Sequence, residues 1–501
     1  MLPLSPQAAL AQFKQDGQKL VGMLATGAAE QGSSVALSAD GGAAIVGGPG
    51  DNNHAGAAWV YTRGDNGVWT RQGGKLLGKG AVGEAQQGFS VALSADGATA
   101  IVGAPYDDKT AGAAWVFTRK YDVWSQQGAK LVGTGAVGHA QQGFAVALSA
   151  DGDTAYMGGP ADNAGAGAAW VFTRKYDVWS QQGAKLVGTG AAGEAQQGIA
   201  VSASANGDTL IVGGNADNHD AGAFWTFIRA GGAWKQQGDK LVGSGAVGKA
   251  QQGFAVALSG DGVTAAVGGP ADHSDSGAAW LFTHSQGVWS QQGAKLVGMG
   301  AVGTSVKQGW SVGLSANGDT AIVGGYGDNT LTGATWPFMR SGGVWSEKGG
   351  KRVGTGAVGQ GWQGYGVGLS GDGDTAIVGG PGDNSFAGAA WLFLQPLQVS
   401  PYAGIAASGT KGGPFSPSSF SYKLRATSGG VKYSISGVPS WLTASSKSGT
   451  LTTADTTITF TLNSGADTLA SGAYVGSIQF NNADGTQGSI WRGATLTVKP
   501  E

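Results

Sequence analysis

The chain has 501 residues, with 95 Gly, 17 Trp and no Cys, a formal net charge of −2 and only 12% charged residues. This length predicts two or three domains, and the absence of Cys excludes disulfides and thiolate metal sites. No Lys/Arg cluster is present, which argues against a nucleic-acid partner, and no apolar run approaches the roughly 20 residues of a membrane span, which argues against membrane insertion.

Residues 1–11 are expected to form an N-terminal extension before the first repeat. The segment Met1–Leu10 (MLPLSPQAAL) lacks both a basic region and a long apolar region. It is therefore not predicted to be a signal peptide, and its residues carry no information on export.

Residues 12–395 contain seven copies of one repeat. A Gly-Ala motif precedes a Trp at intervals of 55 or 56 residues, and the stretches 112–136 and 167–191 are identical. The repeated residues are Trp59, Trp115, Trp170, Trp225, Trp280, Trp336 and Trp391. A period of this length without helical patterning is typical of a β-propeller blade.

Four strands are predicted in each copy. In the second copy, strand a spans residues 88–95, strand b 99–104, strand c 113–119 and strand d 123–131, with apolar and small or polar residues alternating along strand a. Asp96-Gly97 supplies a tight hairpin turn between strands a and b. Four antiparallel strands per copy predict an all-β fold, a seven-bladed β-propeller.

The seventh copy ends after strand c, and its missing strand d is found at the N-terminus. Residues 13–20 (FKQDGQKL) align with residues 124–131 (WSQQGAKL). The N-terminal strand is therefore predicted to complete the last blade and to close the ring, which a linear array would not need.

A second set of repeated aromatic residues lies on strand d. These residues are Trp69, Trp124, Trp179, Trp234, Trp289 and Trp345, with Phe13 in the seventh place. Large aromatic side chains that recur in every blade are expected to fill the wedges between blades and not to stack on sugars.

At these residues the chain resembles the FG-GAP repeat family, whose propeller repeat also occurs in the head of integrin α chains. The second copy carries Gly88-Phe89 and Gly103-Ala104-Pro105, and Asn215 and Tyr326 replace the Pro in two other copies. The resemblance covers residues 12–395 and implies a cell-surface or secreted interaction protein.

Integrin-type blades often hold Ca²⁺ in a long Asp-rich loop between strands a and b. Here that connection is only two residues long, as at Asp96-Gly97. Such a turn cannot wrap an ion that takes six to eight oxygen ligands. Neither a metal nor a cofactor is therefore expected.

Residues 396–501 lack the repeat and are rich in Ser and Thr. Alternating runs occur at residues 420–424, 431–435, 456–462, 474–480 and 494–498, which predicts an immunoglobulin-like β-sandwich. The runs VPSWL (438–442), SGTL (448–451) and GAYVGSI (472–478) resemble BACON-type domains of bacterial secreted proteins. This resemblance implies a carbohydrate- or mucin-associated spacer and a bacterial exported origin.

Two motifs fit enzyme signatures by their letters alone. Gly-x-Gly-x-x-Gly occurs six times, as at Gly133/Gly135/Gly138, but a strand follows it where a dinucleotide site needs a helix. Residues 309–313 (GWSVG) fit the nucleophile elbow but align with strand a. The first motif is interpreted as the crossover between blades, and the second as strand composition.

The candidate ligand-binding residues lie in the loops between strands b and c. They are Asp51, Asp107, Asp162, Asp217, Asp272, Asp328 and Asp383, together with His54, His219 and His273. The d–a loops repeat a Gln, as at Gln87, and are predicted to emerge on the same face. One interpretation is a polar ring that binds a ligand. The alternative is that each Asp caps its own turn and each His is solvated; loop positions that vary between blades, such as Ser385-Phe386, are then better candidates for specificity.

The sequence thus predicts a non-catalytic extracellular binding or adhesion protein, secreted or held at the cell surface. It would present a propeller face to a protein or carbohydrate ligand. A structural component of an extracellular or surface assembly is one alternative, and a propeller-based hydrolase or lyase is another. The near-uniform blades show no blade-specific cluster of acids, His and Arg, which argues against an enzyme.

Overall fold

The computed structural model describes residues 13–64, 67–401, 404–427, 430–483 and 490–500. The chain divides into two compact units, one over Gln15–Leu392 and one that groups the chain through Lys14 with the residues from Phe393 onward. Nearly all regular structure is β, and in the described residues no helix is long and apolar enough to cross a membrane.

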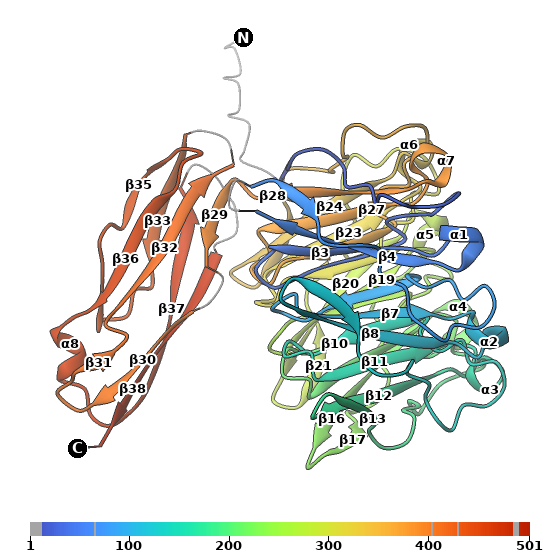
Figure 1. The fold of residues 1–501 in the computed structure, drawn as a ribbon, viewed down its shortest axis with the longest axis horizontal. Helices are drawn as coiled ribbons and strands as arrows, with labels where there is room; N and C mark the ends of the chain where they lie inside the picture. Colours follow the sequence, from blue (N-terminus) through green and yellow to red (C-terminus); the bar gives the residue numbers. More distant parts are fainter. Residues whose placement is uncertain (1–12, 65–66, 402–403, 428–429, 484–489, 501) are drawn as a thin grey trace, which may run out of the picture. The chain divides into compact units, whose positions relative to one another are not determined.

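The first unit is a β-propeller of seven four-stranded antiparallel sheets, which confirms the predicted fold (Figure 1). Strand a of blades 1 to 7 is β2 (Ser34–Leu37), β6 (Ser90–Leu93), β10 (Ala145–Leu148), β14 (Ala200–Ala203), β18 (Ala255–Leu258), β22 (Ser311–Leu314) and β26 (Gly366–Leu369). Strand b is β3 (Ala43–Gly48), β7 (Thr99–Ala104), β11 (Thr154–Gly159), β15 (Thr209–Gly214), β19 (Thr264–Gly269), β23 (Thr320–Gly325) and β27 (Thr375–Gly380).

The outer two strands of each blade follow in the same order. Strand c is β4 (Ala57–Arg63), β8 (Ala113–Lys120), β12 (Ala168–Lys175), β16 (Ala223–Ala230), β20 (Ala278–Ser285), β24 (Ala334–Ser341) and β28 (Ala389–Leu394). Strand d is β5 (Trp69–Arg71), β9 (Val123–Gln126), β13 (Val178–Gln181), β17 (Ala233–Gln236), β21 (Val288–Gln291), β25 (Val344–Glu347) and, in blade 7, β1 (Lys14–Gln15). The a strands of neighbouring blades contact one another, including β2 with β26, so they line the axis of a closed ring.

The ring is closed by the N-terminal segment, as the sequence predicts. β1 pairs with β28, the Asp16 amide donates to the Leu392 carbonyl at 2.8 Å, and Leu20 and Ala390 exchange hydrogen bonds. Leu131 and Ala114 form the same bridge within blade 2. The N-terminal segment therefore takes the place of strand d in the last blade.

The repeated Trp on strand c is the centre of each blade's core. Trp170 is fully buried, and its Nε1 donates to the Thr134 carbonyl at 2.9 Å. A Cβ on Gly133 would overlap the indole, and a Cβ on Gly159 would lie 2.8 Å from its Cζ3. The indole is thus held between two glycines, one from the crossover and one from strand b. This packing explains why the crossover motif begins with Gly.

The wedges between blades are apolar, which confirms the structural interpretation of both aromatic sets. One cluster joins Ile45 and Val60 of blade 1 to Val102 and Trp115 of blade 2, with Trp124 packed against it. The Trp124 Nε1 also donates to Gln72 of blade 1 at 3.0 Å. Each such core is therefore shared by two consecutive blades.

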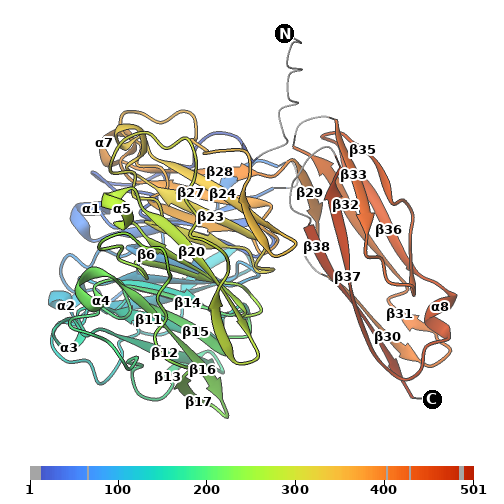
Figure 2. The same ribbon diagram turned by 180° about the vertical axis from the view of Figure 1, so that it is seen from behind.

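The b–c loops form short turn elements along one face of the propeller (Figures 1 and 2). They are α1 (Asp51–His54), α2 (Asp107–Thr110), α3 (Asp162–Gly165), α4 (Asp217–Asp220), α5 (Asp272–Asp275), α6 (Asp328–Leu331) and α7 (Asp383–Phe386). Their second and third residues are left-handed, as at Asn163 (φ 49°) and Ala164 (φ 54°). Asn tolerates this conformation better than other non-Gly residues, which explains why it follows the Asp in five blades.

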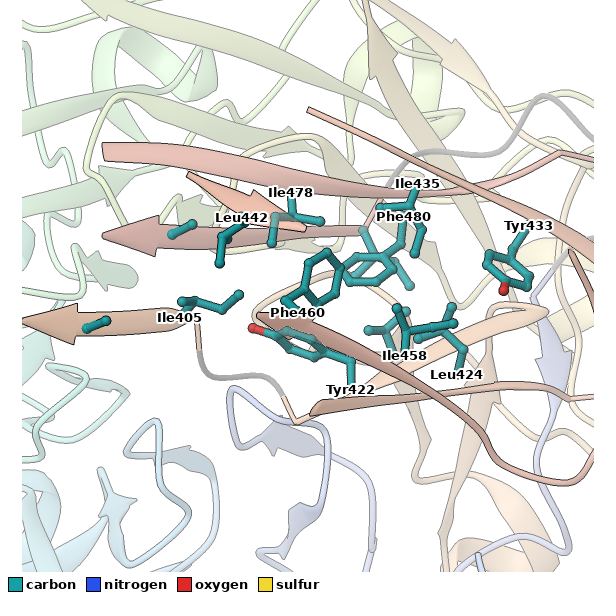
Figure 3. Packing of buried hydrophobic residues seen from close by; sticks show 14 of the residues in the cluster. Ile405, Tyr422, Leu424, Tyr433, Ile435, Leu442, Ile458, Phe460, Ile478 and Phe480 are labelled. Carbon is teal, nitrogen blue, oxygen red and sulfur yellow. The ribbon is translucent and has the colours of Figure 1, made fainter. Parts of the chain in front are cut away.

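The second unit is a two-sheet β domain, as predicted. One sheet has the order β29-β32-β36-β34 and the other β31-β30-β38-β37-β33-β35. The strands are β29 (Leu397–Ser400), β30 (Ile405–Thr410), β31 (Phe415–Ser416), β32 (Ser419–Ala426), β33 (Val431–Ser436), β34 (Leu442–Ala444), β35 (Ser448–Leu451), β36 (Thr456–Leu462), β37 (Gly472–Asn482) and β38 (Ile490–Lys499), with the short helix α8 (Ser464–Asp467). Tyr422, Phe460 and Phe480 from the two sheets meet in one core (Figure 3).

Candidate functional site

The seven predicted Asp residues are the first residues of α1 to α7, and each is at most 1% exposed. In blade 2 the Asp107 Oδ1 accepts a hydrogen bond from the Val82 amide at 2.7 Å, and its Oδ2 pairs with the Lys130 Nζ. Equivalent pairs occur in every blade, as with Lys75 and Asp51 at 2.5 Å. The carboxylates therefore tie the incoming crossover and strand d to the b–c loop, and they cap the crossover and not their own turn.

The repeated Gln residues of the d–a loops are also structural. The Gln87 Oε1 accepts from the Gly78 amide at 2.6 Å, and its Nε2 donates to the Gly78 carbonyl at 3.0 Å. Gln142 makes the same pair with Gly133. Both polar rings of the repeat thus hold crossovers in place and leave few polar atoms free for a ligand.

The three predicted His residues differ from the Asp residues because they are exposed. His54, His219 and His273 lie in α1, α4 and α5. Among the described residues, no group of three or more His, Asp or Glu side chains could hold a metal ion. The His residues therefore remain candidates for surface contact only.

A blade-specific feature that sequence reasoning missed lies on the same face. Six aromatic side chains of blades 5 to 7 gather in the d–a loop before strand a, at the end of strand b and in the b–c loop. We call them the aromatic patch: Phe254, Trp310, Tyr326, Trp362, Tyr365 and Phe386. Five are half-buried, and Phe386 is 42% exposed.

The rings of the patch contact one another in an unbroken series. Trp310 lies 4.4 Å from Phe254, 4.7 Å from Tyr326 and 5.2 Å from Tyr365, measured between ring centroids. Trp362 lies 5.6 Å from Tyr326 and 5.2 Å from Phe386. These separations are those of direct aromatic packing, so the patch is a continuous apolar surface.

The patch adjoins the mouth of the axial channel. A cavity of about 210 Å³ is lined by the first residues of strand a and the residues before them, including Phe254, Trp310 and Tyr365. The opposite side of this mouth carries Phe89, Phe144 and Ile199. The aromatic surface is therefore widest on blades 5 to 7, where the repeat is least regular.

Acidic side chains border the aromatic patch and help to raise the pKa of its two tyrosines. Burial and the charge of Asp275 raise the pKa of Tyr326, while burial, Tyr326 and Glu30 raise the pKa of Tyr365 to about 12. Both hydroxyls therefore stay protonated at neutral pH and can donate hydrogen bonds. Lys307 pairs with Asp275 at 2.6 Å.

Trp362 is the most unusual residue of the patch. Its φ of 53° is left-handed, as it is at the equivalent residue of every blade, for example Gln86 (φ 57°) and Lys307 (φ 62°). Its Nε1 is buried and has no hydrogen-bond partner within the described structure. Four other blades place a Gln at this position, as at Gln86. The repeat does not require a buried indole nitrogen without a partner at a position where most blades carry Gln, and this feature points to a role outside folding.

The sequence contains a signal for this patch. Of the 17 Trp residues, 13 belong to the two repeated sets and two lie in the C-terminal unit, which leaves Trp310 and Trp362. Tyr326 replaces the Pro of the repeat, and Phe386 is a variable loop position. Each departure is unremarkable alone, and only the closed ring brings them together.

Comparison with known families supports the repeat within this fold. Residues 69–117 match the family model of the FG-GAP repeat. Among solved structures, the chain is similar to "Kuenenia stuttgartiensis Hydrazine Synthase", with 13% identity over 72% of this chain and 96% of that chain and a TM-score of 0.45. The comparison with curated proteins finds no match. The chain thus carries an FG-GAP repeat within a seven-bladed β-propeller.

Proposed function

We propose that this protein is a non-catalytic binding protein whose ligand docks on the face that carries the aromatic patch. The single observation behind the proposal is that the departures from the repeat at Trp310, Tyr326, Trp362 and Phe386 converge on one surface. Repeat proteins place specificity where copies differ. Here the copies differ by aromatic side chains.

The chemistry of the patch favours a protein ligand over a glycan. Trp and Tyr are the residues that most often carry binding energy at protein interfaces, because they bury a large area at a low entropic cost. Sugar sites also need several converging polar groups, and the nearby Asp383 and Gln363 are committed to internal contacts. An apolar side chain of a partner protein seated beside Trp362 suits this surface.

An extracellular location is part of the proposal. It rests on the resemblance of the repeat to propellers of surface proteins and of residues 438–478 to spacer domains of exported bacterial proteins. In that arrangement the C-terminal unit is a spacer or a second binding module. Its core is independent of the propeller repeat and contains the buried Tyr422 and Phe460.

The experiment is a selection of phage-displayed peptides on the full chain, run beside a glycan array. Peptides that bind are then titrated against Trp362→Gln and Tyr326→Pro. Both variants restore the residue that most other blades carry, so their folds should persist. Phe144→Ile is the matched control, because it changes an aromatic residue of the same rim, outside the patch, to the residue of blade 4 (Ile199).

We expect selected peptides to lose about tenfold or more in affinity for both patch variants and to keep their affinity for the control. Binding that survives both patch variants would refute the site. A glycan that binds through the patch would replace the protein ligand. No ligand in either screen would favour the alternative of a structural component in a surface assembly.

A further inference from the structure

A second cavity lies between blades 2 and 3 on the opposite face of the propeller, at the a–b and c–d turns. Its volume is about 440 Å³, within the roughly 300–1,000 Å³ of small-molecule sites. Blade 2 contributes Ala98, Arg119 and Lys120, and blade 3 contributes Asp153 and Tyr176. We call this cavity the interblade cleft.

The interblade cleft lacks, on its blade 2 side, a charge pair that blades 3, 4 and 6 have. In blades 3, 4 and 6, the Arg at the end of strand c donates from Nε to an Asp at the a–b turn; the pairs are Arg174–Asp153 at 2.6 Å, Arg229–Asp208 at 2.8 Å and Arg340–Asp319 at 2.8 Å. In blade 2 this Asp is replaced by Ala98. The guanidinium contacts of Arg119 within the described structure involve its Nη1 alone, with Gln72 at 3.3 Å and Asp122 at 3.9 Å. Its Nε edge is thus a donor beside the cleft.

The Tyr at the rim is held in a strained turn. Tyr176 lies between β12 and β13 with φ 51° and is 89% exposed. Blades 4 and 6 have Gly at this position (Gly231 and Gly342), and Gly adopts positive φ without strain, whereas blade 5 has Gln286 with φ 50°. Within the described part of the chain, the only ring contact of Tyr176 is with the Lys175 Nζ, 5.3 Å from its centroid. The fold therefore gains little from this side chain.

The charges around the cleft nearly cancel. Three cations face four carboxylates: Arg119, Lys120 and Arg174 with Asp96, Asp151, Asp153 and Asp177. A strongly charged ligand of either sign would meet like charges. A neutral ligand with many hydroxyl groups can instead accept from the guanidinium groups, donate to the carboxylates and lay one apolar ring face on Tyr176.

We propose that the interblade cleft binds a neutral oligosaccharide, with Tyr176 as the stacking platform and Arg119 as a hydrogen-bond donor to its hydroxyls. This site is separate from the proposed function, because it lies at the other end of the strands from the aromatic patch. Failure of one site therefore leaves the other untouched.

The test is calorimetric titration of the full chain with neutral hexasaccharides of glucose, xylose, mannose and N-acetylglucosamine, and with hexagalacturonate as the charged probe. Two variants remove the site and should not unfold the blade. Tyr176→Gly relieves the strained turn, and Ala98→Asp gives Arg119 the partner that Arg174 has. Tyr121→Gly is the matched control, because Tyr121 occupies the same turn of blade 2 (φ 49°) but does not line the interblade cleft.

We expect one neutral hexasaccharide to bind, and both site variants to weaken it by about tenfold or more with unchanged or higher thermal midpoints. The control should bind as the wild type does. The proposal is overturned if no neutral hexasaccharide binds, if only hexagalacturonate binds, or if Tyr121→Gly weakens binding as much as Tyr176→Gly.

Discussion

The Nζ of Lys19 lies 2.5 Å from the Oδ2 of Asp383, although 364 positions separate the two residues in the chain. The pair is the blade 7 equivalent of Lys75 and Asp51. The Gln15 Oε1 adds a hydrogen bond from the Thr355 amide at 2.6 Å. The N-terminal segment therefore supplies the last blade with a strand, an ion pair and a crossover contact.

Replacing Lys19 by Ala should destabilise the ring. Asp383 would keep a buried charge without its cation, which costs about 3–5 kcal/mol when both partners are buried. Lys19 is 19% exposed, so water compensates part of the loss and we expect about 2 kcal/mol. Urea unfolding measures the difference. Lys423→Ala removes an exposed pair with Asp455 and should cost under about 1 kcal/mol; equal costs for the two variants would contradict the role of Lys19.

Two glycines of one crossover should respond to Ala in different degrees. Gly133→Ala places a methyl group in the indole of Trp170, and overpacking of this kind costs about 3 kcal/mol. Gly135 has φ 78° and open space around it, so Gly135→Ala should cost about 1 kcal/mol from backbone strain alone. Thermal unfolding of both variants checks the order. A larger loss of stability for Gly135→Ala than for Gly133→Ala would show that contact with Trp170 is not the reason for the first Gly of the crossover motif.

Glu30 should make stability depend on pH. Burial raises its pKa above 4.5, with His54 opposing the shift, so the folded state holds the proton more tightly than the unfolded state. The resulting stabilisation is complete below the unfolded pKa and is lost as the pH rises through the folded pKa. Glu30→Gln should therefore raise the thermal midpoint at neutral pH and leave it nearly unchanged well below pH 4.5. Gln already occupies this left-handed position at Gln86 (φ 57°). A gain of equal size at both pH values would refute the assignment.

The two compact units should unfold separately. Phe460 is fully buried and packs edge-on against Tyr422 at 5.8 Å and Phe480 at 6.0 Å. Phe460→Ala should cost about 3–5 kcal/mol. Calorimetry of the full chain should show one transition shifted to lower temperature and the propeller transition in place. A shift of both transitions would show that the two units are coupled.

Most of the fold could be predicted because the sequence contains seven copies of one four-strand repeat. Strand b of blade 2 is observed over the predicted residues 99–104. Strand a is shorter than predicted, Ser90–Leu93, because Gly88 turns with φ 87° in the crossover and the Ser94 hydroxyl is hydrogen-bonded to Asp96. Hydrophobic alternation marks such strands well but does not mark their ends.

The candidate site was less accessible to sequence reasoning. The aspartates recur in every copy, and their burial depends on crossovers that approach from another part of the repeat, as Val82 does for Asp107. The only sign of the left-handed loops in the sequence is the preference for Asn after the Asp. The contact between Trp310 and Tyr326 joins two loops of one blade, and Trp362 reaches it from the next. Single departures from a repeat acquire meaning only when closure places them side by side.

The sharing of each apolar core between two consecutive blades has a consequence for how the ring can be rearranged. Ile45 and Val60 of blade 1 are buried against Trp115 of blade 2, so they would lose their core contacts if blade 2 were absent. Removing one blade would expose half of a shared core on each of the two neighbouring blades. Joining the present chain ends and opening the chain at a crossover would keep every core intact. The propeller should therefore fold after circular permutation but not after deletion of a single blade. A change in blade number should be tolerated only where the remaining blades can close the ring again.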